Sequence, residues 1–191
     1  MSGSIRRQMR QPPFLWGAVS GAVIGWAVTT APYLNWWPAA APLDQPHLVV
    51  RSDGKGSGEF GAPRSGRRRH HGVDLEAPIG TPVRAIRSGV VVETGTHRGL
   101  GRYVEVEHGR ELRSLYGHLQ AIDVQVGQRV RQAQLIGTVG KTGNARSPII
   151  KPHLHIEILR GDTPVDPERF GLTLVRVEAP TESHDDADGG E

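Results

Sequence analysis

Three short histidine motifs in this sequence have residue types that could bind a metal ion and activate water. They are HHGVD at residues 70–74, YGH at 116–118 and HLH at 153–155. The chain has no cysteine, which excludes disulfides, thiolate metal sites and cysteine nucleophiles. A metal site in this protein must therefore be built from histidine and carboxylate groups, which are good zinc ligands.

The third motif has the pattern of a β-strand. Because side chains alternate along a strand, His153, His155 and Glu157 share one face. The two histidines then stand about 6–7 Å apart. That spacing lets one histidine bind a metal while the other lies close enough to contact a water molecule at the metal. The opposite face is apolar and is expected to pack in the core; it carries Leu154, Ile156 and Ile158.

In the first motif, Gly72 permits a tight backbone course, so that His70 and Asp74 can converge on one ion. Three protein ligands and one open position are the layout of a catalytic rather than a structural zinc site. Taken singly, the motifs have simpler interpretations. The first histidine pair also suits a solvated basic loop, and the strand pair also suits half-buried histidines bonded to the backbone.

The elements that must position these motifs have an all-β pattern from residue 70 to about 177. Short runs of β-branched and aromatic residues are separated by glycine turns every ten or so residues. This pattern predicts a mostly β fold with a small antiparallel sheet or sandwich, and not a parallel α/β fold. The expected strands are 90–94, 102–108, 112–118, 122–130, 135–139 and 153–159, with a short strand at 47–50 and one helical turn at 166–170.

A basic segment at the N-terminus precedes an uncharged one. Residues 1–13 contain three arginines, and residues 14–33 contain no charged side chain. Its apolar run, 14–31, is at the lower end of the length that spans a bilayer, and all four tryptophans lie in or beside the segment. We expect a single-pass transmembrane signal-anchor at 14–33, with 1–13 in the cytoplasm and the remainder on the periplasmic side of the cell membrane.

A cleaved signal peptide is the alternative for this segment. The small residues Ala39, Ala40 and Ala41 could form a cleavage site, but they stand well beyond the apolar run. Glycines recur every four positions within the run, which would allow a weak helix-mediated dimer; they are Gly17, Gly21 and Gly25.

The other flanking segments are expected to be irregular. Residues 34–69 are rich in proline and glycine and are interpreted as a linker and lead-in, and the acidic residues 178–191 as a disordered tail. The net charge of +3 is small. Arg64 and the run 67–69 form a basic cluster without interleaved aromatic residues, so nucleic-acid binding is not expected.

The motifs together resemble the lysostaphin/LytM-type zinc endopeptidases, which cut peptide cross-links of bacterial cell walls. The resemblance covers roughly residues 70–160, nearly the whole expected domain, and its segments follow the family's order. It implies a duplicated-hybrid-motif, barrel-sandwich-like fold for residues 70–177. The matching segments are 70–75, 77–83, 88–91, 99–101, 116–119, 126–130, 136–143 and 152–155.

By this resemblance, His70, Asp74 and His155 are ligands of Zn2+. The resemblance also places His118 and His153 beside the attacking water. One of these two acts as general base and the other stabilises the developing oxyanion. The implied protein is a membrane-anchored zinc metalloendopeptidase whose substrates are peptidoglycan stem peptides.

Two other classes of function were weighed. Some relatives have lost ligands and only activate other hydrolases, so a non-catalytic regulator or wall-binding module in the same fold is the alternative. This chain has all five residues, which favours an enzyme. A biotinyl- or lipoyl-type carrier is disfavoured because no lysine stands at a suitable hairpin tip: the lysines are Lys55, Lys141 and Lys151.

The segment 144–151 departs from the family pattern. It precedes the final histidine motif and is expected to form part of the wall of the substrate groove. Its basic residues, Arg146 and Lys151, lead to the hypothesis that the groove favours an acidic peptide. By the resemblance, the bond that is cut lies either in a glycine bridge or between D-alanine and a diamino acid.

Overall fold

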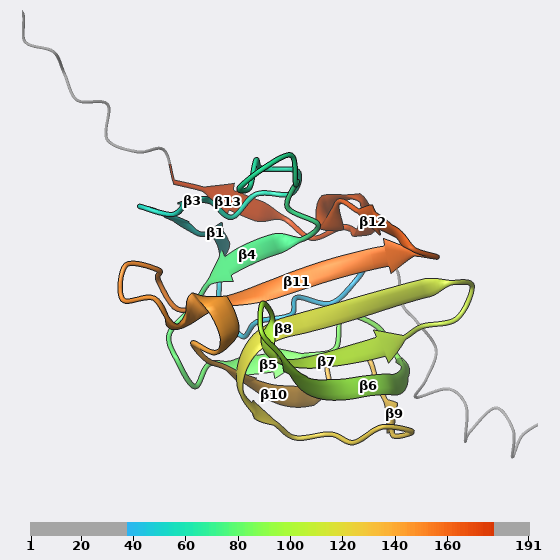
Figure 1. Ribbon diagram of the computed structural model, residues 1–191. Helices are drawn as coiled ribbons and strands as arrows, with labels where there is room; N and C mark the ends of the chain where they lie inside the picture. The colour runs from blue at the N-terminus through green and yellow to red at the C-terminus, as the bar shows by residue number, and fades with distance from the viewer. Residues whose placement is uncertain (1–37, 178–191) are drawn as a thin grey trace, which may run out of the picture. The chain divides into compact units, whose positions relative to one another are not determined.

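The computed structural model describes residues 38–177, which are almost entirely β structure (Figure 1). The mostly β fold class is thus confirmed. Within residues 38–177, no helix is long and apolar enough to cross a membrane. The basic segment 1–13, the expected transmembrane helix 14–33 with its weak dimer, and the acidic tail 178–191 lie outside the described residues.

The described chain contains thirteen strands and two short 3-10 helices. They are, in order, β1 (Leu48–Val50), β2 (Ser52–Asp53), β3 (Gly56–Ser57), β4 (Val73–Glu76), β5 (Pro82–Arg84), β6 (Gly89–His97), β7 (Gly101–Glu107), β8 (Leu112–Ile122), β9 (Arg129–Val130), β10 (Leu135–Val139), η2 (Gly143–Arg146), β11 (His153–Arg160), β12 (Thr163–Val165), η3 (Pro167–Phe170) and β13 (Leu174–Arg176).

Eleven of these strands form one sheet, and β11 lies near its middle. The strand order is β13-β1-β4-β11-β8-β7-β6-β9, with β10 joined to β5 and β8, and β12 joined to β11. Both neighbours of β11 along this path, β4 and β8, run antiparallel to it. The strand that carries the third histidine motif therefore has the first motif on one side and the second on the other (Figure 1).

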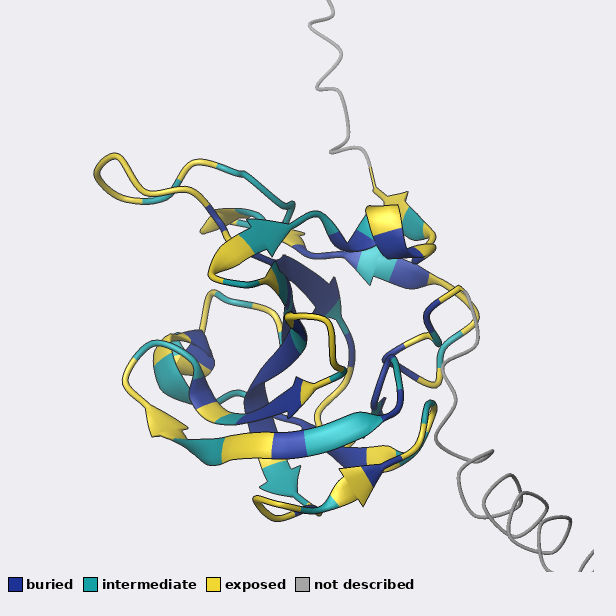
Figure 2. Ribbon diagram, turned by 90° about the vertical axis from the view of Figure 1, so that its right-hand side faces the viewer, coloured by how far each residue is buried: buried dark blue, intermediate teal, exposed yellow. Residues whose placement is uncertain are grey.

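The core is formed by the apolar faces of these central strands, which are mostly buried (Figure 2). Side-chain alternation explains most of it, because Val104, Val106 and Ile156 are all fully buried. Glu105 on the opposite face is an exception to the usual exposure of charged residues, since it is only 8% exposed. Arg113 on the adjacent strand pairs with its carboxylate at 2.7 Å, which offsets the cost of burying the charge.

The expected strand at 122–130 is wrong. Strand β8 ends at Ile122, the chain turns, and only Arg129–Val130 is a strand. Gly127 has φ +85° in this turn, a conformation that favours glycine and interrupts a strand. Val126, which precedes Gly127 in this turn, is 59% exposed and packs in no core. The predictions of a short strand at 47–50 and a helical turn at 166–170 are confirmed by β1 and η3.

Residues 38–69 pack against the rest of the described domain, although their composition predicts a linker and lead-in. Leu43, Leu48 and Val50 are buried in the same core as β11. Strand β1 pairs with β4 and with β13. The described residues all belong to one compact unit. Proline and glycine content indicates a loose chain, but it does not reveal which strands a segment will pair with.

Two residues of β8 belong to a buried network of hydrogen bonds. The hydroxyl groups of Ser114 and Tyr116 share a hydrogen bond of 2.9 Å, and the backbone N–H of Ile86 donates to the Tyr116 oxygen. His108 completes the network. Its Nδ1 donates to the carbonyl of Ser88 at 3.0 Å, so Nε2 of the neutral ring accepts from Ser114 at 2.7 Å. Burial lowers the pKa of His108 to about 4.

This low pKa predicts that part of the domain's stability is lost in mild acid. Below pH 6.5 the unfolded chain protonates His108, whereas the folded chain does so only near pH 4. The unfolded state therefore binds more protons in this window, and the free energy of unfolding falls as the pH falls. Between pH 7 and pH 5 the contribution of His108 is about 2 kcal/mol.

The measurement is urea unfolding at pH 7 and pH 5, in the presence of a chelator, for wild type and His108→Gln. We expect the difference in unfolding free energy between the two proteins to shrink by the amount given above on going to pH 5. Equal differences at both pH values would contradict the assignment.

Candidate metal centre

The register of β4 against β11 brings the first and third histidine motifs together. Asp74 lies directly opposite His155 in this antiparallel pair. Side chains directly opposite one another have Cβ atoms about 4.5–5.5 Å apart. On the other side of His155, strand β8 places Gly117, which has no side chain to crowd the imidazole.

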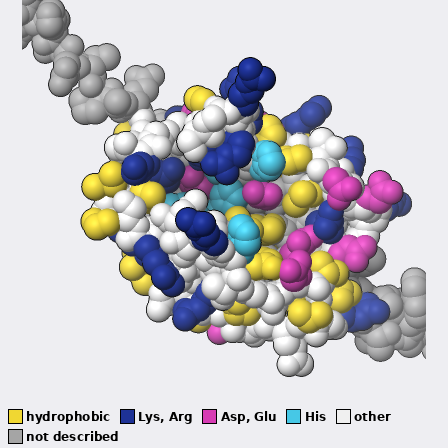
Figure 3. All heavy atoms as spheres, viewed as in Figure 1, with side chains coloured by type: hydrophobic (Ala, Val, Ile, Leu, Met, Phe, Trp, Pro, Cys, Tyr) yellow, Lys and Arg dark blue, Asp and Glu magenta, His cyan; other side chains and the backbone are white. Residues whose placement is uncertain are grey.

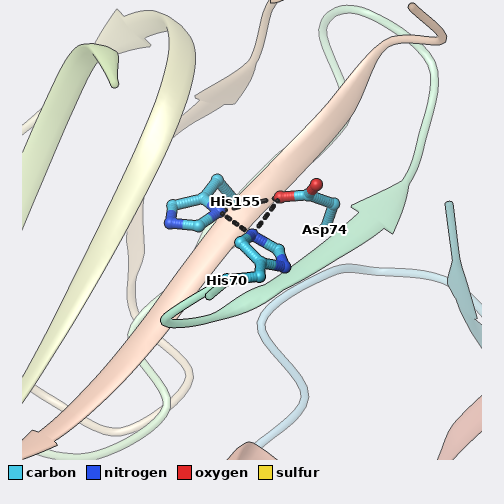
Figure 4. Close-up of side chains that lie close together, drawn as sticks. All are labelled: His70, Asp74 and His155. Carbon is cyan, nitrogen blue, oxygen red and sulfur yellow. Dashed lines mark hydrogen bonds and ion pairs between the residues drawn. The ribbon is translucent and has the colours of Figure 1, made fainter. Parts of the chain in front are cut away.

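Three donor atoms converge between these strands (Figure 4). Nε2 of His70 lies 3.1 Å from Oδ1 of Asp74 and 3.1 Å from Nδ1 of His155. Oδ1 of Asp74 and Nδ1 of His155 are 2.7 Å apart. All three residues are buried, with 4–8% of their surface exposed.

This triangle fits a zinc ion. Tetrahedral zinc with nitrogen and oxygen ligands at about 2.0–2.2 Å keeps neighbouring ligand atoms roughly 3.3 Å apart. The observed separations are close to this value and need only a small expansion. Two imidazoles and one carboxylate also match the donor types that zinc takes at sites with an open fourth position. The residues could therefore hold zinc and leave one position for a reactant.

Groups behind the ligands fix which ring nitrogen faces the triangle. Nδ1 of His70 donates to the carbonyl of Glu59 at 2.8 Å, so the Nε2 lone pair faces Asp74. Nε2 of His155 donates to the carboxylate of Glu157 at 2.9 Å, so Nδ1 faces inward. Such outer hydrogen bonds orient metal-binding histidines and increase their basicity.

Gly72 is required by the close approach of two backbones. A Cβ atom at this position would lie 2.2 Å from the carbonyl oxygen of Ile156 on β11. The sequence suggested that Gly72 permits a tight course between His70 and Asp74. The structure adds that the glycine lets this course pass directly over β11, which places His70 above His155.

The second oxygen of Asp74 is held by two arginines. Its Oδ2 lies 3.0 Å from Arg51 and 3.3 Å from Arg64. Arg51 is itself only 4% exposed and also pairs with Asp53 at 2.6 Å. Burial raises the pKa of Asp74, but hydrogen bonds with His155 and His70 and their charges outweigh it and hold the pKa well below its ordinary value.

Arg51 is expected to stabilise both the fold and the metal centre. Replacing it by methionine in Arg51→Met removes the buried guanidinium that pairs with Asp53 and with Oδ2 of Asp74, which costs about 3 kcal/mol of unfolding free energy. A less firmly held Asp74 should also weaken zinc binding roughly 10- to 100-fold. Urea unfolding of the metal-free protein and a zinc competition titration measure the two effects.

The matched control is Arg84→Met, which breaks the more exposed pair between Arg84 and Asp44. It is expected to cost less than about 1 kcal/mol and to leave zinc affinity unchanged. If Arg51→Met behaved like this control in both measurements, Arg51 would have no such role.

The other two predicted residues, His118 and His153, lie beside the triangle. Their ring centroids are 4.7 Å apart, and His118 lies 5.8 Å from His155. Nε2 of His153 is 3.8 Å from Oδ1 of Asp74.

Backbone carbonyls fix the tautomers of these two histidines. Nδ1 of His118 donates to the carbonyl of Thr142 at 3.0 Å, and Nδ1 of His153 donates to the carbonyl of Lys151 at 2.7 Å. Each neutral ring therefore keeps an Nε2 lone pair.

Burial sets the charge state of this pair. It lowers the pKa of His118 to about 3 and also lowers the pKa of His153. Both rings are then neutral at pH 7 and can accept a proton. For His155, burial acts in the same direction, but the hydrogen bonds with Asp74 and Glu157 raise its pKa to about 9. The surroundings of His155 thus favour a charged imidazole, whereas those of His118 and His153 favour neutral rings.

The backbone of His118 is strained. Its φ is +60°, which non-glycine residues rarely adopt and which costs about 1–3 kcal/mol. The pairing of β8 with its neighbours is irregular near this residue. The His118 N–H donates to the carbonyl of Leu100 at 2.7 Å, outside the regular ladder. This contact holds the strained conformation, which turns the imidazole toward His153.

The structure thus brings all five predicted residues into one cluster, with His71 exposed beside it. Sequence reasoning assigned no function to Glu157, although alternation had placed it on the same face as His155. It also missed Arg51 and the pairing of Arg64 with Asp74. A buried salt bridge between distant segments has no local signal, so only the fold could have revealed these contacts.

Comparisons with known proteins agree with this arrangement. The sequence model of peptidase family M23 matches residues 68–167, which include all five residues of the cluster. The peptidoglycan DD-endopeptidase ShyA of Vibrio cholerae is 42% identical over 105 residues, covering 55% of this chain and 24% of that protein. The chain therefore spans about a quarter of the length of this curated relative.

Two solved structures have the same fold. A zinc-containing peptidase from Vibrio cholerae is 32% identical with a TM-score of 0.58, and the match covers 70% of this chain and 40% of that one. The catalytic domain of lysostaphin from Staphylococcus simulans is 36% identical with a TM-score of 0.53, covering 60% of this chain and 89% of that one.

Proposed function

Because the chain belongs to peptidase family M23, a family of zinc metalloenzymes, we propose that residues 38–177 form a zinc endopeptidase that cuts peptide cross-links of bacterial peptidoglycan. The observation that carries the proposal is the buried triangle of His70, Asp74 and His155 with two further histidines beside it. A structural zinc site would instead be closed by a fourth protein ligand.

In this proposal His70, Asp74 and His155 hold the zinc ion. When bound there, zinc would polarise the scissile carbonyl and lower the pKa of water at the open position. The outer contacts from the Glu59 carbonyl and from Glu157 keep the two imidazoles turned toward the ion. His118 and His153 stand beside this triangle and would lie next to a reactant held there.

His118 and His153 supply the proton transfers. Each neutral ring has a lone pair on Nε2, because its Nδ1 donates to a backbone carbonyl. Either ring can therefore accept the proton that the attacking water loses. Once protonated, that ring has an N–H group with which it can stabilise the oxyanion or return the proton to the leaving amine. The net reaction forms a carbon–oxygen bond and breaks the carbon–nitrogen bond, and both protons of the water pass to the leaving nitrogen, which gives a carboxylate and an ammonium group.

Metal removal tests this proposal. Purified peptidoglycan is expected to lose turbidity with the zinc-loaded protein, to stay turbid after chelation, and to lose turbidity again when zinc is restored. Hydrolysis that continues unchanged in the fully demetallated protein, checked by elemental analysis, would refute the role of the metal. A zinc-loaded protein that releases nothing from any wall preparation would instead support a non-catalytic regulator.

We also propose that residues 14–33 anchor the enzyme in the cell membrane with its catalytic domain on the periplasmic side. The support is the uncharged run with its tryptophans and the arginines that precede it. Full-length protein is expected in the membrane fraction, and a variant lacking residues 1–33 in the soluble one. Full-length protein that is released by high salt, as a peripheral protein would be, would contradict the anchor.

A further inference from the structure

A cleft of about 870 Å³ is bounded by η2 and by the loop between β6 and β7. Three of its lining residues are arginines, and none is an aspartate or glutamate. Figure 3 shows lysine and arginine side chains around the histidines at the centre of one face. The arginines are Arg68, Arg98 and Arg146, and the two facing walls include Gly99 on one side and Gly143 and Asn144 on the other.

The cleft adjoins the catalytic histidines. The loop that contains Gly99 also supplies the Leu100 carbonyl that accepts the N–H of His118. Thr142, which precedes Gly143 in the other wall, accepts the hydrogen bond from the His118 ring. The two walls are tied together, because the N–H of Asn144 donates to the carbonyl of Gly99 at 3.0 Å. A ligand in this cleft would therefore lie beside His118.

The arginines of the cleft differ from the other basic residues near the site. Arg51 and Arg64 are paired with Asp74, and Lys151 is paired with Glu76 at 2.9 Å. Among the described residues, neither Arg98 nor Arg146 forms an ion pair with a carboxylate, and both are exposed.

Arg68 is similarly placed at the edge of the cleft. Its guanidinium donates to the Ser65 hydroxyl at 3.1 Å and to no carboxylate of the described residues. Three arginines that pair with no carboxylate of the described residues therefore line this one cleft.

We propose that Arg98 and Arg146, with Arg68 at the edge, bind a free carboxylate of the peptide substrate and so determine specificity. A guanidinium matches a carboxylate with two parallel hydrogen bonds, which gives geometric selectivity as well as charge attraction. The proposal rests on the proposed function of the neighbouring site. The hypothesis drawn from the sequence named Arg146 and Lys151 as the basic groups of the groove. The structure keeps Arg146 in this role, but Lys151 is paired with Glu76, and Arg98 is the second basic group instead.

The test compares two forms of one substrate. The first is a purified cross-linked muropeptide with free carboxylates, and the second is the same compound with its carboxylates amidated. The variants are Arg98→Ala, Arg146→Ala and the double variant. The control is Arg160→Ala, which removes an equal, exposed charge at the other end of β11 from His153.

For the free carboxylate substrate, kcat/KM of the double variant is expected to fall about 10- to 100-fold, mainly through a higher KM. Amidation should lower kcat/KM of wild type by a similar factor, and the double variant should show little further loss with the amidated substrate. The Arg160→Ala control should match wild type with both compounds. Equal kcat/KM of wild type for both compounds, or equal losses by the double variant on both, would overturn the proposal.

A binding measurement separates this proposal from the proposed function. The zinc-loaded His118→Ala variant, with and without the two arginine substitutions, is titrated with a fluorescently labelled form of each compound. The free carboxylate compound should bind more tightly, and this preference should disappear with the arginines. If wild type hydrolyses neither compound, the proposed function fails, and the presence or absence of this preference still decides the role of the cleft.

Discussion

The variant His155→Ala is expected to lose zinc and to hydrolyse peptidoglycan at least roughly a thousandfold more slowly than wild type. His155 supplies one corner of the ligand triangle and also links Asp74 to Glu157. Without its imidazole, two ligands are left, and the Glu157 carboxylate loses the N–H donor of His155. Elemental analysis of the purified variant and its rate on isolated cell walls measure the two losses.

His71→Ala is the matched control for this variant. His71 is adjacent to a ligand in the sequence, but it is exposed and lies outside the ligand triangle. Its replacement should leave zinc content and rate within about twofold of wild type, as is usual for surface substitutions. Full activity of His155→Ala, or equal losses in both variants, would show that the ligand assignment is incorrect.

The variants His118→Ala and His153→Ala are expected to keep zinc and yet to lose about 10²- to 10⁴-fold in kcat, the usual contribution of a general acid or base. Both rings lie beside the triangle with a free lone pair on Nε2. Stoichiometric zinc in an inactive variant would separate this role from metal binding.

The double variant gives a sharper result. If the two histidines act in the same proton-transfer sequence, the loss in the double variant should be much smaller than the product of the two single losses. Single variants that retain wild-type kcat, with their zinc content unchanged, would show that neither ring takes part in catalysis.

Strand periodicity was sufficient to predict one half of this site. Alternation along 153–158 placed His153, His155 and Glu157 on one face, and the hydrogen bond between His155 and Glu157 agrees with this. The same alternation explains why Val104 and Val106 are both buried. These predictions succeed because the direction of a side chain on a strand depends only on its parity within that strand.

The other half depends on long-range pairing. Asp74 meets His155 because β4 and β11 pair in one particular register, and a shift by one residue would send the side chains to opposite faces. The chain between them does not encode this register locally. Only the resemblance to a known family linked the two motifs before the structure did.

Backbone groups explain what else was missed. The carbonyls of Glu59, Thr142 and Lys151 orient three of the histidines. Every residue has a carbonyl group, so its use as an acceptor has no signal in the sequence. The basic cluster around Arg64 illustrates a related difficulty. Its composition indicates surface charge, yet Arg64 pairs with Asp74 and Arg68 lines the cleft.

The most direct test of the central claim is mass spectrometry of the muropeptides that the protein releases from purified peptidoglycan. Zinc-loaded wild type is expected to convert cross-linked muropeptides to monomers, each cut adding one water, about 18 Da, and exposing one new amine. Metal-free wild type and His118→Ala should leave the cross-linked species intact. If cross-linked muropeptides stayed unchanged with zinc-loaded wild type, or fell equally in all three samples, the proposed zinc endopeptidase activity would be contradicted.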